Sequence, residues 1–144
     1  MNFLLDTCVL SETIKPKPDI GLVSWLKNQK PDNLFVCSIS LGELRKGIDR
    51  LPGGKKRHDQ LLWLLAMINE YDGRFIDFDT ESALRWGSLS ASLETSGKPM
   101  PVLDAMIAAC ALRYGYTLVT RNERDYQHSG VPMVNPWKVD ADLV

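Results

Sequence analysis

Four carboxylates, far apart in the chain, lie beside short apolar segments: Asp6, Glu43, Asp104 and Asp125. Acidic side chains next to apolar runs are held by rigid elements at the edge of a core, where several of them can converge. Because converging anions repel one another, such a cluster predicts a cation between them. Hard oxygen ligands suit Mg²⁺ or Mn²⁺, which share their coordination with phosphate oxygens, so these residues point to phosphate chemistry.

A metal-activated water is the nucleophile that this set can supply, because two ions about 3.5–4 Å apart stabilise both the attacking and the leaving oxygen. The two histidines, His58 and His128, lie in polar segments and give little support to histidine-based RNA cleavage. The sequence contains neither GxxxxGK[ST] nor GxGxxG after its first predicted strand. Asp6 stands alone after that strand, whereas an aspartyl-phosphate phosphatase or a receiver-like signalling domain requires an acidic pair there.

Each carboxylate also has a purely structural explanation. Asp6 can cap the helix that follows it, and Glu43 follows Ser40 by three residues, the spacing of a capping box. Asp104 lies early in a predicted helix, where the helix dipole favours an anion. Asp125 can be ordinary surface charge. None of these explanations accounts for the compatible placement of all four residues in one α/β pattern.

Short apolar segments alternate with helical ones along the chain. Strands are predicted at 3–5, 34–37, 75–78, 117–120 and 131–134. Helices are predicted at 7–13, from 19 to before 31, from a cap at Ser38 or Ser40 to 51–54, at 55–69, after a cap at Asp79, and from Pro101 at the first position to 114–115. This alternation implies right-handed crossovers and a parallel sheet covered on both faces.

The predicted elements bring the four carboxylates to one place. In open sheets of this kind, ligands bind beyond the carboxyl ends of the strands. Asp6 and the loop 120–125 fall at that edge, and Glu43 and Asp104 reach it from early turns of helices.

The composition predicts one soluble globular domain. The chain has 144 residues, of which 44% are hydrophobic and 24% are charged. No apolar run approaches the roughly 20 residues that cross a bilayer, and the first six residues do not resemble a secretion signal. We therefore expect a cytoplasmic protein without a membrane partner. Cys8, Cys37 and Cys110 form no CxxC or Cys/His cluster, so buried reduced thiols are expected and a zinc site is not.

The formal net charge of −1 is unusual for a protein that handles nucleic acid. However, basic side chains outnumber acidic ones once the four candidate carboxylates are set aside. A basic region beside a metal-filled acidic site can hold a polyanion; a solvated helix face with a charged loop explains the same run. The candidate RNA-binding residues are Arg45, Lys46, Arg50, Lys55, Lys56 and Arg57.

Four segments together resemble the PIN-domain ribonucleases and, more narrowly, the VapC toxins of the FitB-like group in bacterial toxin–antitoxin modules. They are LLDTCVLSE, SISLGELRKGIDRLP, LDAMIAACALRYGYTLVTRNERDY and VPMVNPW. The resemblance runs from about Phe3 to Trp137. It implies a three-layer α/β/α sandwich with a parallel central sheet, a single PIN domain over 1–144, and Mg²⁺- or Mn²⁺-dependent hydrolysis of RNA phosphodiester bonds.

The resemblance also implies roles for the acidic residues. Asp6 and Asp104 match the most direct metal ligands of the family. Glu43 and Asp125 match positions that complete the pocket, often through water or a second ion. All four are therefore expected as catalytic and metal-binding residues.

Polar neighbours of the acidic residues match the family less uniformly. Thr120 and Asn122 match a polar pair that orients the site, and Thr7 supplies a neighbouring hydroxyl. Cys8 stands where many relatives have Asn, which predicts the loss of a polar contact that steadies Asp6. A change of this kind tunes a metal site without abolishing it.

The partners implied by the resemblance are an RNA substrate, a cognate antitoxin, operator DNA bound through the antitoxin complex, and a second copy of the chain. The antitoxin's C-terminal segment is expected in the acidic groove. The alternative is a PIN-like module with weak or no catalysis that acts by binding antitoxin and operator DNA. Transfer, ribosomal and messenger RNA are all compatible with a groove that reads backbone and shape.

Overall fold

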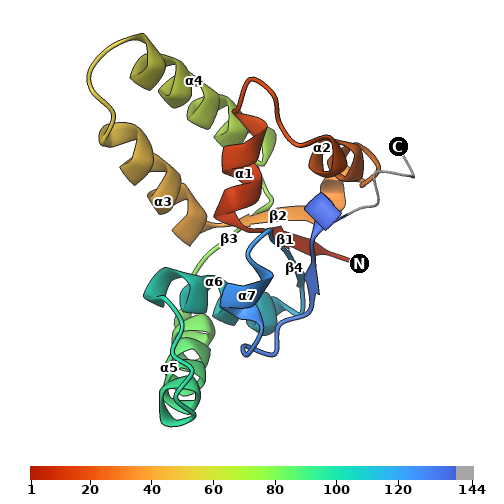
Figure 1. Ribbon diagram of the computed structural model, residues 1–144, viewed down its shortest axis with the longest axis vertical. Coiled ribbons are helices and arrows are strands. Elements are labelled where there is room, and N and C mark those ends of the chain that lie inside the picture. Colours follow the sequence, from red (N-terminus) through yellow and green to blue (C-terminus); the bar gives the residue numbers. More distant parts are fainter. Residues whose placement is uncertain (139–144) are drawn as a thin grey trace.

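A parallel sheet of five strands, in the order β3-β2-β1-β4-β5, forms the centre of the molecule in the computed structural model, which describes residues 1–138 (Figure 1). Its strands are β1 (Phe3–Leu5), β2 (Leu34–Cys37), β3 (Phe75–Ile76), β4 (Thr117–Val119) and β5 (Met133–Val134). β1 is central and pairs in parallel with β2 on one side and β4 on the other. The strand order changes direction at β1, so a crevice is expected beyond its carboxyl end.

Helices cover both faces of the sheet. They are α1 (Thr7–Thr13), α2 (Ile20–Lys27), α3 (Ser38–Asp49), α4 (Lys55–Glu70), α5 (Thr80–Thr95), α6 (Val102–Tyr114) and the short α7 (Glu123–Tyr126), with 3-10 turns at Pro31–Asn33 and Pro136–Lys138. In Figure 1, α1 to α4 lie on one side of the sheet and α5 to α7 on the other. The predicted three-layer α/β/α sandwich is confirmed.

Two hydrophobic cores lie on the two faces because successive strand residues point in opposite directions. Leu5, Val36 and Val119 pack with residues of α1, α3 and α4. Their strand neighbours Leu4 and Leu118 pack against α6. Every strand residue of this set is completely buried, so the continuous apolar runs of the sequence reflect a sheet that is covered on both faces.

The cysteines belong mainly to the second core. Cys37 and Cys110 are completely buried with their sulfur atoms 3.5 Å apart, and Cys8 is half-buried. All three are free thiols. Full burial therefore holds for two of the three, and the reduced state stays a prediction.

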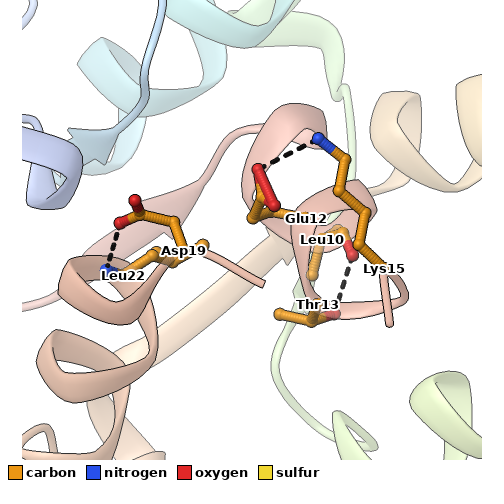
Figure 2. A network of polar contacts seen from close by, with 6 residues as sticks. All are labelled: Leu10, Glu12, Thr13, Lys15, Asp19 and Leu22. Carbon is orange, nitrogen blue, oxygen red and sulfur yellow. Dashed lines mark hydrogen bonds and ion pairs between the residues drawn. The ribbon is translucent and has the colours of Figure 1, made fainter. Parts of the chain in front are cut away.

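The connection between α1 and α2 is fixed by polar contacts of its own (Figure 2). Lys15 Nζ lies 3.1 Å from an oxygen of Glu12, a carboxylate that is buried at the end of α1. Asp19 caps α2 by accepting a hydrogen bond of 3.0 Å from the Leu22 backbone N–H. The Lys15–Glu12 contact holds the far end of α1, the helix whose first residue follows Asp6. The Asp19 contact fixes the start of α2.

Several predicted boundaries differ from the structure. β3 is shorter than predicted because the Phe78 N–H points to the Ser38 hydroxyl at 3.4 Å and leaves the sheet. β4 and β5 are also shorter, and α7 was not predicted. Pro101 is the N-cap of α6, one position before the predicted one, and Gly115 ends this helix at a φ of 72° as a left-handed C-cap.

Two further findings concern the extent of the chain. Nothing among the helices of residues 1–138 has the length and apolarity needed to span a membrane. Residues 139–144, which the sequence prediction assigned to the same domain, lie outside the described residues.

Candidate active site

Asp6 is fixed by the elements that meet at the carboxyl end of β1. Its backbone N–H continues the pairing with β4 through a 2.9 Å hydrogen bond to the Val119 carbonyl. Its side chain caps α1 by accepting from the Thr7 N–H at 2.8 Å. The capping explanation is therefore correct. Asp6 is only 4% exposed and lies at the predicted edge of the sheet.

Further donors surround the Asp6 carboxylate. The Thr120 hydroxyl donates to Oδ2 at 2.8 Å and the Tyr126 hydroxyl donates to Oδ1 at 3.1 Å. Both donors are completely buried. Burial raises the pKa of Asp6, and hydrogen bonds, the one from Thr120 above all, partly offset this by stabilising the charged form.

Asp104 lies in the first turn of α6 and is half-buried. The Tyr126 hydroxyl lies 3.3 Å from its Oδ1 atom. The pKa of Asp104 is raised to about 6, first by burial and then by the negative charges of Asp6, Asp125 and Glu43. All four predicted carboxylates therefore share one electrostatic environment.

Glu43 reaches the site from the second turn of α3. Its Oε1 atom accepts a 2.8 Å hydrogen bond from the Thr7 hydroxyl, which also lies 2.8 Å from the Ser40 hydroxyl. The capping-box explanation is wrong, because Ser40 lies inside the helix and faces α1. The predicted Ser38 or Ser40 cap is also wrong: Cys37 occupies the N-cap, without a side-chain capping bond to the described chain.

Asp125 is exposed on α7, at a greater remove from the buried residues. The segment before it is tied to Asp6 through Thr120, whose hydroxyl accepts from the Asn122 N–H at 2.9 Å. The Asn122 carbonyl in turn accepts from the Asp125 N–H at 3.0 Å. Thr120 thus links the buried carboxylate to the loop that carries the exposed one.

Cys8 keeps a weak contact with Asp6. Its thiol donates to Oδ2 at 3.6 Å and lies 3.7 Å from the Thr120 hydroxyl. The pKa of Cys8 is raised to about 11 by burial and then by the charge of Asp6, so the thiol is neutral near pH 7. The predicted loss of a contact to Asp6 is therefore wrong, although a thiol is a weaker donor than an amide.

The basic run lies along α3 and the start of α4, beyond Glu43 in the direction of the α3–α4 connection, which projects away from the sheet (Figure 1). Part of its charge is paired. Asp49 lies 3.0 Å from Arg45 and 3.6 Å from Arg57, and Lys55 lies 4.0 Å from Asp59. The structure brings these arginines together around Asp49 and does not bring them onto the carboxylates.

The sequence reasoning missed two contacts at the site: Tyr126 on Asp6 and Asp104, and Ser40 on the Thr7 hydroxyl that also binds Glu43. Tyr126 was missed because four residues of α7 carry no helical periodicity, and an aromatic residue after Asp125 has no signal that distinguishes core from site. Ser40 was read only as a cap. Its contact with Thr7 depends on the packing of α1 against α3, which local sequence does not reveal.

The donor set fits a divalent cation in its chemistry. Within residues 1–138 no three His, Cys, Asp or Glu side chains form a ready-made metal-binding group. The carboxylates are nevertheless hard oxygen donors, and two of them share the Tyr126 hydroxyl. Burial first, and then repulsion from the other carboxylates, raises the pKa of Asp104. A cation relieves this repulsion, and Mg²⁺ and Mn²⁺ need few protein ligands because they keep several waters.

Comparison with known proteins finds relatives that match nearly the whole chain. The chain is 32% identical over 142 residues to "VapC ribonuclease Y4jK" of Sinorhizobium fredii, covering 94% of this chain and 97% of that protein. It is 31% identical to "Toxin FitB" of Neisseria gonorrhoeae, covering 93% and 97%. A solved structure of FitAB bound to an IR36 DNA fragment superposes with a TM-score of 0.89 at 29% identity, covering 96% of this chain and 97% of that one.

The family model for the PIN domain matches residues 3–130. The matched range begins in β1, ends after α7 and contains all four candidate carboxylates. The resemblance stated from the sequence motifs is therefore confirmed, and this chain belongs to the PIN-domain family.

Proposed function

We propose that this protein is the toxin of a toxin–antitoxin module and an endoribonuclease that hydrolyses RNA phosphodiester bonds with the help of Mg²⁺ or Mn²⁺. The observation that carries the proposal is the convergence of carboxylates on shared partners: the Tyr126 hydroxyl lies 3.1 Å from Asp6 and 3.3 Å from Asp104, and Thr7 donates to both Asp6 and Glu43. The names of the relatives, a VapC ribonuclease and a FitB toxin, support the same conclusion.

In this proposal Asp6 and Asp104 hold the cation, and Glu43 and Asp125 place a second ion or a water. When bound, the cation supplies Lewis acidity and an activated water. The protein supplies position. The Thr7 N–H and the Thr120 hydroxyl fix Asp6, and the Thr7 hydroxyl fixes one oxygen of Glu43. Asn122 orients the loop that presents Asp125.

Asp104 completes the proposed site on its open side. It is half-buried, so it can meet both the buried Asp6 and a phosphate that arrives from solvent. The RNA backbone is proposed to follow the basic residues of α3 and α4, of which Arg45, Arg57 and Lys55 are partly neutralised by aspartates.

The proposed partners are RNA, a cognate antitoxin, operator DNA contacted through the antitoxin complex, and a second copy of the chain in a homodimer. The described FitAB complex, which is bound to DNA, supports the antitoxin and DNA partners. Residues 1–144 are proposed to form one PIN domain, of which the family match covers 3–130.

RNA cleavage with a matched pair of variants tests the proposed reaction. Total RNA is incubated with the purified protein in Mg²⁺ or Mn²⁺, or in chelator, and the fragments are sequenced from their 5′ ends. We expect discrete fragments only with metal. Asp104→Asn should lower the rate by more than about 100-fold, because a direct ligand matters more than its supporting residues. Asp72→Asn, which removes an exposed carboxylate just before β3 and so at the edge of the sheet opposite the site, should cleave normally.

Two outcomes would contradict the proposal. Cleavage that continues in chelator would exclude the metal role. The absence of fragments at high protein concentration, together with operator binding in complex with the antitoxin, would favour the non-catalytic binding module.

A further inference from the structure

The Tyr126 hydroxyl lies between the two carboxylates proposed to hold the cation. It is 3.1 Å from Asp6 Oδ1 and 3.3 Å from Asp104 Oδ1. One hydroxyl therefore joins residues from the end of β1 and the start of α6, which are 98 positions apart in the sequence. No other side chain among residues 1–138 is recorded in contact with both.

The tyrosine reaches the carboxylates from the core. Tyr126 has no exposed surface, and its ring packs with Leu4, Ile107 and Leu118 in the second core. Asp104 is half-buried, so part of its surface is open to solvent. A cation can therefore approach the pair through Asp104, whereas Tyr126 is enclosed in the core.

The main chain around Tyr126 is also fixed. Its carbonyl accepts hydrogen bonds from the Ser129 hydroxyl at 2.6 Å and the Ser129 N–H at 3.0 Å. The Ser129 hydroxyl in turn accepts from the Val131 N–H at 3.2 Å. These hydrogen bonds fix the main chain that carries the phenol ring.

The chemistry of a phenol suits this position. A phenol ordinarily titrates only at about pH 10, so at neutral pH the hydroxyl is an uncharged donor and adds no negative charge. A neutral donor lowers the repulsion between two carboxylates while leaving lone pairs of both on the solvent side. A lysine or arginine would also pair with the carboxylates, but its positive charge would compete with the cation.

We propose that Tyr126 is a positioning residue that holds Asp6 and Asp104 together from the core and presents their free oxygens to the cation. This inference rests on the proposed metal role of the two aspartates. Supporting residues behind metal ligands typically change metal affinity by about 10–100-fold. The effect should therefore be visible in binding, independently of catalysis.

Mn²⁺ titration of the full chain without RNA, by calorimetry and electron paramagnetic resonance, tests the proposal. Tyr126→Phe removes only the hydroxyl and should weaken Mn²⁺ binding by at least about tenfold. Tyr116→Phe is the matched control, because Tyr116 precedes β4 at the end opposite Thr120 and packs on Phe35. It should bind Mn²⁺ like the unchanged protein. Raising the Mn²⁺ concentration should restore RNA cleavage by Tyr126→Phe.

The outcomes separate the two proposals. If the unchanged protein binds Mn²⁺ and Tyr126→Phe binds it equally or more tightly, the positioning role is wrong and the metal role stands. If the unchanged protein binds no Mn²⁺, the metal role is wrong and this inference falls with it. Should Tyr126→Phe not fold, Ser129→Ala provides the test instead. It keeps the Tyr126 hydroxyl but removes the Ser129 hydroxyl that donates to the Tyr126 carbonyl. Weaker Mn²⁺ binding then supports the role, and unchanged binding overturns it.

Discussion

The acidic edge of the sheet and the basic α3–α4 region differ in how their charges are held. Asp6 is 4% exposed and accepts from donors that are themselves buried. Arg45 and Asp49 form an ion pair of comparable length, 3.0 Å, but their side chains are 55% and 44% exposed. Buried hydrogen bonds to a charge fix geometry, whereas exposed pairs are screened by solvent and salt. Reaction chemistry needs the fixed geometry of the buried acidic edge. Binding of a polyanion without regard to its sequence is compatible with the exposed, screened charges of the basic region.

Among the changes that test this contrast, loss of the Thr120 hydroxyl should have the largest effect on stability and RNA cleavage. Thr120→Val leaves Asp6 Oδ2 without its shortest donor and the Asn122 N–H without an acceptor. An unmet hydrogen bond at a buried group costs about 1–3 kcal/mol of folding stability. A shifted ligand should lower RNA cleavage by about 10–100-fold. Urea unfolding and initial cleavage rates measure the two effects.

Thr117→Val is the control for this prediction, since Thr117 lies at the opposite end of the same strand and is not completely buried. It should change neither quantity appreciably. Equal losses in both variants would mean that the strand as a whole, and not the hydroxyl next to Asp6, is responsible.

The acidic edge should also make the metal-free protein less stable as the pH rises. The folded-state pKa of Asp104 is about 6, above its ordinary value of 3.8, so the folded chain binds more protons than the unfolded chain between these values. The stabilisation from this protonation is complete below about pH 4 and is lost as the pH rises through about 6. At about 1.4 kcal/mol per pKa unit the full shift corresponds to about 3 kcal/mol, and because Asp104 is only half-buried and screened by solvent we expect about 1–2 kcal/mol.

Denaturation in chelator at pH 5 and pH 7 measures this dependence. Asp104→Asn should flatten it, and saturating Mn²⁺ should oppose it, because the cation favours the ionised carboxylates. A pH response that is the same in Asp104→Asn and the unchanged protein would place its origin elsewhere, for instance in Asp6, whose pKa is also raised.

The smallest effect is expected in the basic region. Asp49→Asn removes the shared partner of Arg45 and Arg57 and should leave the melting temperature nearly unchanged. It should tighten binding of catalytically inactive Asp104→Asn protein to single-stranded RNA a few-fold at low salt, an advantage that disappears at high salt. Fluorescence anisotropy at two salt concentrations measures it. Weaker RNA binding would show that the paired geometry, and not the free charge, is what RNA recognises.

Most of the fold could be predicted because short buried strands and amphipathic helices leave strong local patterns. The segments 3–5 and 34–37 are strands with those bounds, and 7–13 is a helix with those bounds. The strand after Phe75 was predicted too long, because its end is set by a contact with Ser38 from another element.

The site could be predicted only in part, for the same reason. Asp6 and Asp104 are marked by the apolar runs beside them, so their placement at the edge followed from the element pattern. Tyr126 and the partners of Thr7 depend on distant elements packing together. The Ser40–Glu43 spacing is a genuine local signal, but tertiary contact with Thr7 overrides it.

The pairing of β1 with β4 has a consequence for the synthesis of the protein. Phe3 and Thr117 are neighbours in the sheet, so β1 cannot pair with β4 until Thr117 has been synthesised. The four carboxylates are spread from residue 6 to residue 125 and meet only after that pairing. A chain still emerging from the ribosome therefore lacks an assembled site until β4 and Asp125 have been made. The stretch that encodes these elements is translated before the product becomes able to cut RNA.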